Sequence, residues 1–234
     1  MAIKYNYILT LAIAAMLLSC KKDNYKPPAT TLSGKVVYKG EALQLENNQV
    51  PYQLYQDGFG KVGAITQTFE QDGSYSSLLF DGQYKLIIPN GQGPFIWKQN
   101  AAGDPDTLIV NLKGNQTLDL EVMPYYLIRT PQLAAASGKV TGSFKIEKII
   151  TDAHAKDIEN VKLYINKTQF VSEGDNNIAS TSLDGSAIVD VNNVSLSVAI
   201  PAIVPTQNYV YARIGLKISG VEDRIFSPVQ KITF

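Results

Sequence analysis

Turn signals recur along most of this chain, and they are its strongest constraint on the fold. Asp-Gly pairs, in which glycine tolerates the positive φ that tight hairpins require, occur at 57–58, 72–73, 81–82 and 184–185. Short β-rich segments lie between such turns, for example at 31–38, 50–55 and 84–88. A turn signal about every ten residues favours a sandwich or barrel over alternating strands and helices. We therefore predict an all-β fold, in which the polar segment 151–160 is a loop or a single turn.

The strands fall into two series, which predicts two consecutive β-sandwiches. The first series opens with Ser33-Gly34-Lys35-Val36-Val37, and the second opens with Ser137-Gly138-Lys139-Val140-Thr141. Between them, the segment from Pro124 to Pro131 is a natural place for one strand series to end, because proline interrupts strand pairing. We therefore place the two domains at 32–124 and 125–234, each of a normal size for one sandwich.

Cys20 is the only cysteine in the chain, and it directly follows an apolar segment. Lys4 supplies a positive charge, and residues 8–18 form an uncharged run that is too short to span a bilayer but suits a signal peptide. Leu17-Leu18-Ser19-Cys20 resembles the bacterial lipobox, in which the cysteine is acylated and the chain is cut just before it. The alternatives are an ordinary secretory peptide with an incidental cysteine, or a free core thiol.

The lipobox resemblance implies that the mature protein is tethered to a membrane. It places a signal peptide at 1–19 and a lipidated N-terminus and linker at 20–31. A single acyl chain holds a protein only marginally, so two or three chains on Cys20 are needed for a stable anchor. Membrane lipid is therefore an expected partner of Cys20.

The charge balance argues against nucleic acid as a partner. Lys and Arg together number 21, as do Asp and Glu, so the formal net charge is zero. No long-range field attracts this chain to nucleic acid or to an anionic surface.

Catalytic chemistry is nearly absent from the sequence. His154 is the only histidine, so a zinc site with several imidazoles is excluded. A Ser-His-Asp triad would need His154, which sits in a polar segment, and no glycine-flanked nucleophilic serine is present. A pair of carboxylates for glycoside hydrolysis stays open, but the acids lie mostly in turns. We expect no enzyme activity, no cofactor and no metal, although the Asx-rich segments 104–106 and 173–177 leave loop calcium as an alternative.

Trp97 is the only tryptophan, and it is the best candidate for ligand binding. It lies in a glycine-rich segment beside a polar loop, where an exposed ring could stack on a sugar. Lys98, Gln99 and Asn100 follow it and can donate hydrogen bonds. The alternative is that Trp97 packs in a core or between domains.

Each half of the chain resembles a known type of sandwich. In the first half, Gly34-x-Val36, Asp72-Gly73-Ser74-Tyr75 and Gly82-Gln83-Tyr84-Lys85-Leu86 resemble the carboxypeptidase-regulatory-like, or transthyretin-like, domain, whose signature is a Gly-x-Tyr strand followed by a Gly-x-Tyr-x-Leu strand. In this Gly-x-Tyr pattern, each Asp-Gly pair makes the turn, and we expect the tyrosine two residues later to point inward. In the second half, segments 209–217 and 225–232 resemble the last hairpin of an immunoglobulin or fibronectin-type-III domain.

The order of these segments, together with Gly93-Pro94-Phe95, Asp106-Thr107 and Val122-Met123-Pro124-Tyr125-Tyr126, resembles one family over most of the chain. It is the Bacteroidetes lipoprotein family known as domain of unknown function 3823. Its members look like accessory lipoproteins of starch-utilisation-type systems, which pair a TonB-dependent porin with a binding lipoprotein to import glycans or peptides.

The resemblance implies a lipid-anchored accessory protein of the outer membrane that binds a polysaccharide or oligosaccharide without cleaving it. Lys21-Lys22-Asp23-Asn24 partly resembles the signal that directs such lipoproteins to the cell exterior. Asp106-Thr107-Leu108 resembles the O-glycosylation acceptor of this phylum, with Thr107 as the acceptor residue. The alternative function is that of a structural spacer or complex subunit with no ligand of its own.

Overall fold

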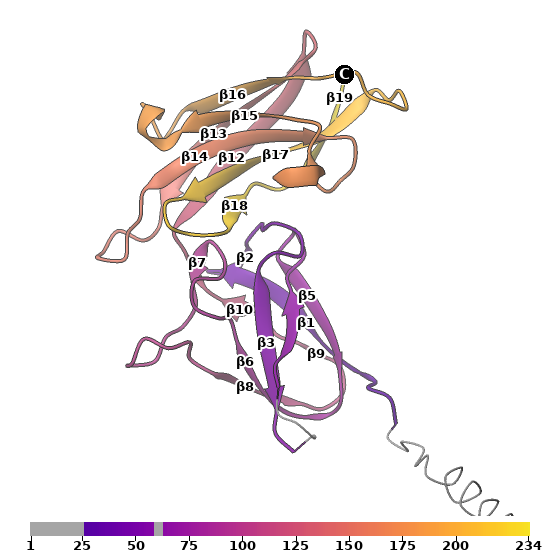
Figure 1. Ribbon diagram of the computed structural model, residues 1–234, viewed down its shortest axis with the longest axis vertical. Coiled ribbons are helices and arrows are strands. Elements are labelled where there is room, and N and C mark those ends of the chain that lie inside the picture. The colour runs from indigo at the N-terminus through magenta and orange to yellow at the C-terminus, as the bar shows by residue number, and fades with distance from the viewer. Residues whose placement is uncertain (1–25, 59–62) are drawn as a thin grey trace, which may run out of the picture.

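The computed structural model describes residues 26–58 and 63–234, which form two β-domains stacked along the longest axis of the molecule (Figure 1). The predicted signal peptide, Cys20 and the first part of the linker lie outside the described residues. Within the described residues, no helix is long and apolar enough to cross a membrane. The all-β, two-domain prediction is confirmed.

Two facing sheets build the N-terminal domain. In the first sheet, β1 pairs antiparallel with β2 and β5 and parallel with the short strands β9 and β10. The second sheet has the order β4-β3-β6-β8 and is antiparallel throughout. The strands are β1 (Thr30–Tyr38), β2 (Glu41–Ala42), β3 (Pro51–Gln56), β4 (Ile65–Thr68), β5 (Ser74–Leu79), β6 (Gly82–Ile87), β8 (Leu108–Leu112), β9 (Gln116–Thr117) and β10 (Leu120–Glu121).

Tyrosine rings fill the space between these sheets, as the Gly-x-Tyr pattern predicts. Tyr52, Tyr75 and Tyr84 are all at most 2% exposed. Tyr52 and Tyr75 pack edge to face with ring centroids 5.0 Å apart, and Phe69 completes the aromatic cluster. Their hydroxyls are satisfied inside the domain, because Tyr52 shares a 2.7 Å hydrogen bond with Ser77 and Tyr75 donates to the Leu118 carbonyl.

The C-terminal domain is a second sandwich with immunoglobulin-like strand pairing. One sheet has the order β12-β13-β16, and the other has the order β15-β14-β17 with β18 and β19 both paired to β17. The strands are β12 (Tyr126–Ala136), β13 (Lys139–Lys148), β14 (Ile158–Asn166), β15 (Ala179–Asp184), β16 (Val194–Ala199), β17 (Tyr209–Ile218), β18 (Arg224–Phe226) and β19 (Gln230–Thr233). Two single turns of 3-10 helix, η1 (Gly174–Asn176) and η2 (Gly185–Ala187), lie in its loops.

Two local predictions need correction. The expected loop 151–160 ends early, because Ile158 already pairs with Ile218 and begins β14. The expected last strand, 225–232, is divided into β18 and β19. At this break, the Ser227 hydroxyl accepts the Ile214 N–H at 3.0 Å in place of a backbone carbonyl. Pro228 has no N–H that could donate a hydrogen bond to the neighbouring strand.

The two domains share a continuous hydrophobic core and a polar joint. Arg213 of β17 is fully buried and donates to the carbonyls of Leu45 and Val171, while its guanidinium lies 3.7 Å from the Phe226 ring centroid. Phe226 itself donates its N–H to the Gln44 carbonyl across the joint. These contacts fix the C-terminal domain to the loop that follows β2.

Candidate functional site

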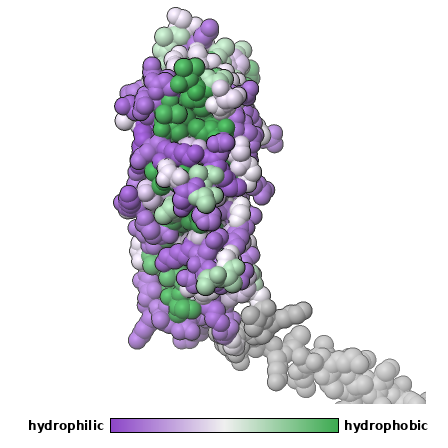
Figure 2. Space-filling view, turned by 90° about the vertical axis from the view of Figure 1, so that its left-hand side faces the viewer, coloured by the Kyte–Doolittle hydropathy of each residue, from purple (hydrophilic) through white to green (hydrophobic). Residues whose placement is uncertain are grey.

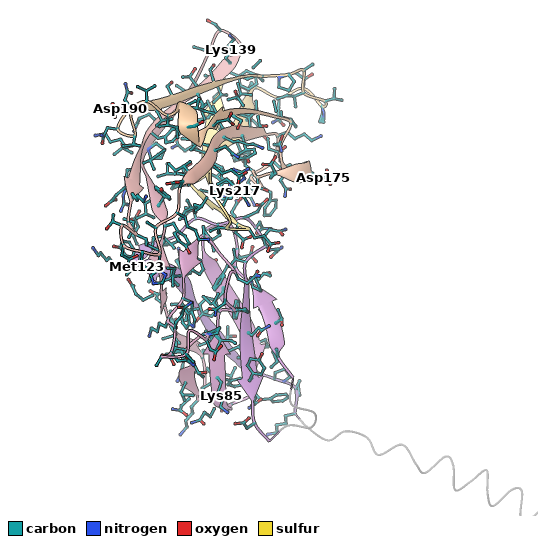
Figure 3. The ribbon with its side chains drawn as sticks, turned by 60° about the vertical axis from the view of Figure 1, so that its left-hand side comes forward. Lys85, Met123, Lys139, Asp175, Asp190 and Lys217 are labelled. Atoms are coloured by element: carbon teal, nitrogen blue, oxygen red, sulfur yellow. The ribbon has the colours of Figure 1, made fainter. Side chains whose placement is uncertain are left out.

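A two-stranded ribbon at the junction of the domains adjoins two recesses of the molecule. It consists of β7 (Phe95–Ile96) and β11 (Met123–Pro124), which pair antiparallel. A groove of about 380 Å³ and a smaller junction cavity of about 90 Å³ both adjoin this ribbon. Figure 3 shows Met123 at the edge of the molecule where the two domains meet.

Trp97 is buried, so the open stacking face considered in the sequence analysis is absent. The side chain is only 4% exposed, and its indole N–H donates to the Asp106 carbonyl at 2.8 Å. The alternative of a packed tryptophan therefore describes the structure. The small exposed remainder of Trp97 contributes to the walls of both recesses.

The structure brings three of the four predicted binding residues to the recesses. Lys98 is exposed on the groove, with its Nζ 5.9 Å from the Trp97 ring centroid. Gln99 lines both recesses and donates to the Asn90 side chain at 3.2 Å. Asn100 lines neither, and its side-chain oxygen instead accepts the N–H groups of Ala102 and Asp104. Asn100 therefore shapes the adjacent turn.

The groove takes its remaining walls from segments that the sequence analysis did not single out. Tyr38 ends β1, Glu121 ends β10, and Met123 is 50% exposed in β11. Glu121 is oriented by the backbone, because its carboxylate accepts the Lys39 N–H at 2.6 Å. Apolar walls with a few polar groups on the rim are typical of small-ligand sites. No local pattern marks these residues, because parallel pairing of β10 with β1 brings them together.

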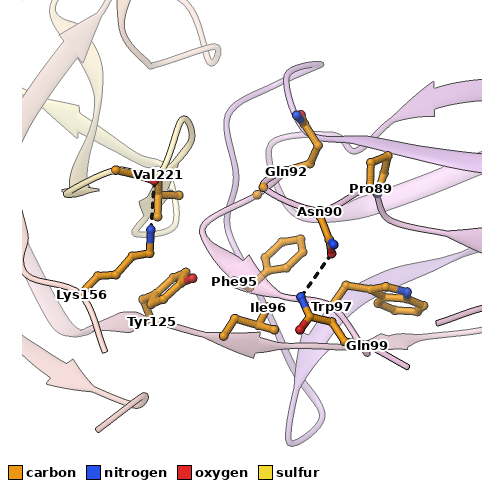
Figure 4. Close-up of a pocket in the computed structure, with 13 residues that line it drawn as sticks. Pro89, Asn90, Gln92, Phe95, Ile96, Trp97, Gln99, Tyr125, Lys156 and Val221 are labelled. Atoms are coloured by element: carbon orange, nitrogen blue, oxygen red, sulfur yellow. Dashed lines mark hydrogen bonds between the residues drawn. The ribbon is translucent and has the colours of Figure 1, made fainter. Parts of the chain in front are cut away.

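The junction cavity is formed by both domains (Figure 4). The N-terminal domain contributes the glycine-rich turn 89–93, and the C-terminal domain contributes Lys156 and the 220–221 turn. Lys156 Nζ donates to the Gly220 carbonyl at 3.0 Å and lies 5.7 Å from the Tyr125 ring centroid. Burial raises the pKa of the Tyr125 hydroxyl, so this group stays protonated and can donate.

The buried carboxylate of Asp223 contacts the glycine-rich turn 89–93. Asp223 accepts the Gly93 N–H at 2.8 Å across the domain junction. Burial raises the pKa of this carboxyl, against the opposing effect of the Gly93 hydrogen bond. Gly93 also permits the close approach of Phe95, since a Cβ there would lie 2.5 Å from the ring. The Gly93-Pro94-Phe95 segment is thus an element of the joint.

The other predicted sites lie apart from these recesses. Thr107 is exposed, and its N–H is accepted by the Asp106 carboxylate at 2.9 Å. In the 173–177 loop, the Glu173 carboxylate is already engaged by Lys162, Tyr164 and Arg224. Among the residues that the structure describes, no group of three His, Cys, Asp or Glu side chains could hold a metal ion. His154 is exposed in a turn that the Asp152 side chain closes.

An apolar patch lies on the C-terminal domain, near the upper end of the molecule in Figure 2. Exposed hydrophobic side chains of this domain include Val189 and Val191, which follow η2. Val189 borders a shallow recess of about 310 Å³ that has no aromatic wall. This surface lacks the combination of rings and polar groups found beside β7.

Both domains match the models of known protein families. Residues 30–123 match the N-terminal domain of the protein family of unknown function DUF3823, and residues 126–231 match the domain of unknown function DUF3823_C. No curated protein matches the sequence.

Solved structures agree with this placement. A DUF3823 family protein from Parabacteroides merdae is 34% identical, with 89% of this chain and 100% of that chain covered and a TM-score of 0.76. A DUF3823 family protein from Bacteroides ovatus is 29% identical, with 88% and 99% covered and a TM-score of 0.75.

A third structure, from Bacteroides uniformis, shares the fold. It is described as a "putative carbohydrate binding protein", is 20% identical, and has a TM-score of 0.70 with 89% and 100% of the two chains covered. The two domain matches and the 34% identical relative show that this chain belongs to the DUF3823 family.

Proposed function

We propose that the protein is a lipid-anchored accessory protein of the outer cell surface that binds a glycan without cleaving it and serves a TonB-dependent uptake system. The groove beside β7 and β11 carries this proposal. Its walls offer apolar and aromatic surface from Tyr38 and Met123, and its rim offers Lys98 and Gln99 for hydrogen bonds. Sugars are recognised by this combination, since their apolar faces pack on rings while their hydroxyls need polar partners.

Several observations favour binding over catalysis at this groove. Glu121 is the only carboxylate among the lining residues, and it accepts a backbone N–H. Glycoside hydrolysis ordinarily uses two carboxyl groups that flank the scissile bond. The carbohydrate-binding description of the Bacteroides uniformis structure agrees with a binding role.

Affinity electrophoresis of residues 21–234 through a panel of polysaccharide gels tests the proposal. We expect retardation by at least one polysaccharide, and we expect Tyr38→Ala with Lys98→Ala to abolish it. Lys85→Ala is a matched control, because Lys85 is an exposed lysine at the opposite end of the N-terminal domain (Figure 3). Unchanged mobility in every gel would contradict glycan binding, whereas retention that survives the double substitution would contradict only the groove.

The anchor is tested separately. Metabolic labelling with a radioactive fatty acid is expected to label the full-length chain and to leave Cys20→Ala unlabelled. A labelled Cys20→Ala variant would contradict acylation of this cysteine, without bearing on the groove.

A second function, that of a rigid spacer or complex subunit, is favoured by the buried joint around Arg213. Two sandwiches fixed end to end would hold a partner at a set distance from the membrane. In that case, cross-linking to the porin would persist in the groove variant that has lost glycan binding.

A further inference from the structure

We infer that the bound glycan is acidic and that its carboxylate or sulfate group lies in the junction cavity against Lys156, while the sugar ring occupies the groove. This inference rests on the proposed function, because it specifies the ligand of the same surface. It extends the binding site to residues of the C-terminal domain and specifies that the ligand is negatively charged.

The groove and the junction cavity are neighbours. Ile96, Trp97 and Gln99 line both of them, so one ligand can contact the two recesses at once. The groove, at about 380 Å³, has room for a sugar ring, whereas the cavity, at about 90 Å³, suits a small substituent. A ligand that crosses β7 therefore passes from the N-terminal domain to residues of the C-terminal domain.

The charge of the junction cavity favours an anion. Lys156 is the only charged residue among those that line it. Its one hydrogen bond goes to the Gly220 carbonyl, and within the described part of the chain it forms no salt bridge with a carboxylate. An ammonium group has three donors, so two remain for a ligand. The nearby Asp223 carboxylate is buried and already accepts the Gly93 N–H.

Two neutral donors also line the cavity. The Tyr125 hydroxyl and the Gln92 side-chain amide both line the cavity, and neither has a hydrogen-bond partner among the residues that the structure describes. Figure 4 shows Tyr125 beside the Lys156 side chain, on the side of the cavity that faces the C-terminal domain. A carboxylate or sulfate beside Lys156 could accept from the ammonium and from the Tyr125 hydroxyl together.

Two pairs of polymers, each an anionic polymer and an uncharged polymer with the same sugar backbone, test this inference. Polygalacturonate is compared with its methyl ester, and dextran sulfate is compared with dextran, by affinity electrophoresis of residues 21–234. We expect the protein to bind at least one anionic polymer more tightly than the uncharged polymer of the same pair. Binding to the carboxylate polymer alone or to the sulfate polymer alone would identify the anionic group.

Substitution of the lysine localises the charge. Lys156→Gln is expected to weaken binding of the anionic polymer about tenfold, because it removes a charge-assisted hydrogen bond. Lys148→Gln is the matched control, since Lys148 lies at 5.7 Å over the Tyr126 ring in the same way but lines neither recess. Its binding should equal that of the unsubstituted chain, and thermal unfolding should show that both variants are folded.

Two results would overturn the inference while leaving the proposed function intact. One is equal binding of each anionic polymer and the uncharged polymer of the same pair, with loss in the Tyr38→Ala, Lys98→Ala variant. The other is an equal loss in Lys156→Gln and Lys148→Gln, which would indicate diffuse electrostatic attraction. No binding to any polysaccharide of either charge would instead contradict the proposed function itself.

Discussion

Trp97 is an apolar ring whose one polar atom is satisfied inside the protein. Its indole N–H reaches the Asp106 carbonyl, and only 4% of the residue is exposed. Its contribution is therefore packing beneath the recesses, and ligand recognition falls to the side chains around it. Tyr38 and Lys98, which remain accessible, are the better targets for substitution.

Asp223 makes the stability of the protein depend on pH. Burial raises the pKa of this carboxyl above its ordinary value of 3.8, so the folded protein holds this proton more tightly than the unfolded chain. Its contribution therefore lowers the free energy of unfolding as pH rises from 3.8 through the raised pKa. We expect Asp223→Asn, which keeps an acceptor for Gly93, to remove this loss.

Urea unfolding of both proteins across this pH range measures the effect. The stability of Asp223→Asn relative to the unsubstituted chain should increase with rising pH and then level off. A relative stability that decreases over the same range would show that the ionised carboxylate is favoured in the folded state.

At the scale of elements, the turn between β4 and β5 is shaped by a close backbone approach. Gly73 has φ of 76°, and a Cβ there would lie 2.2 Å from the Leu43 carbonyl oxygen. Gly40, in the turn between β1 and β2, has φ of 79° but no atom within 4 Å of the same position. A side chain at Gly40 would therefore meet backbone strain alone, whereas a side chain at Gly73 would meet both backbone strain and a steric conflict.

We expect Gly40→Ala to lower the free energy of unfolding by about 1 kcal/mol, the cost of a left-handed alanine. Gly73→Ala should cost roughly 2 kcal/mol more, because the Leu43 segment must also move. Chemical denaturation of the two variants gives the comparison. Equal losses would show that the Leu43 contact can relax without cost.

Local patterns in the sequence account for elements that depend on near neighbours. Asp-Gly turns and alternating residues predicted the strands β1, β3 and β6, and the Gly-x-Tyr pattern of the resembled domain predicted the inward direction of Tyr75 and Tyr84. The interruption between β18 and β19 was missed although Pro228 is a local signal for it, whereas the hydrogen bond between Ser227 and Ile214 of another strand leaves no local signal.

The recesses were predictable only in part. Lys98 and Gln99 lie beside Trp97 in the chain, so a search around the only tryptophan finds them. Tyr38 and Lys156 reach the same surface through the pairing of β1 with β10 and through the packing of the two domains. Contacts of such high sequence separation leave no local signal.

At the scale of the whole molecule, the joint around Arg213 determines whether the two domains act as one body. Burial lowers the pKa of this guanidinium to about 9, so it stays charged at neutral pH. It is held by the Leu45 and Val171 carbonyls and the face of Phe226. The charged Arg213 side chain therefore connects the loop after β2 to three parts of the C-terminal domain: its own strand β17, β18 and the loop that contains Val171.

Arg213→Ala is expected to lower the free energy of unfolding by about 3 kcal/mol, because it leaves a cavity and two unpaired carbonyls. It should also divide a single calorimetric unfolding transition into two, one for each domain. Arg129→Ala, which breaks the half-exposed ion pairs with Glu41 and Glu147, is the control and should cost less than about 1 kcal/mol. A single transition in Arg213→Ala would show that the shared hydrophobic core couples the domains without the guanidinium.

Amide hydrogen exchange with and without the polysaccharide that retards the protein shows whether a glycan binds beside the β7–β11 ribbon. We expect slower exchange in segments 96–100 and 121–125 when the glycan is bound. Protection confined to the apolar surface around Val189 and Val191, or no protection in any described segment, would contradict glycan binding beside this ribbon.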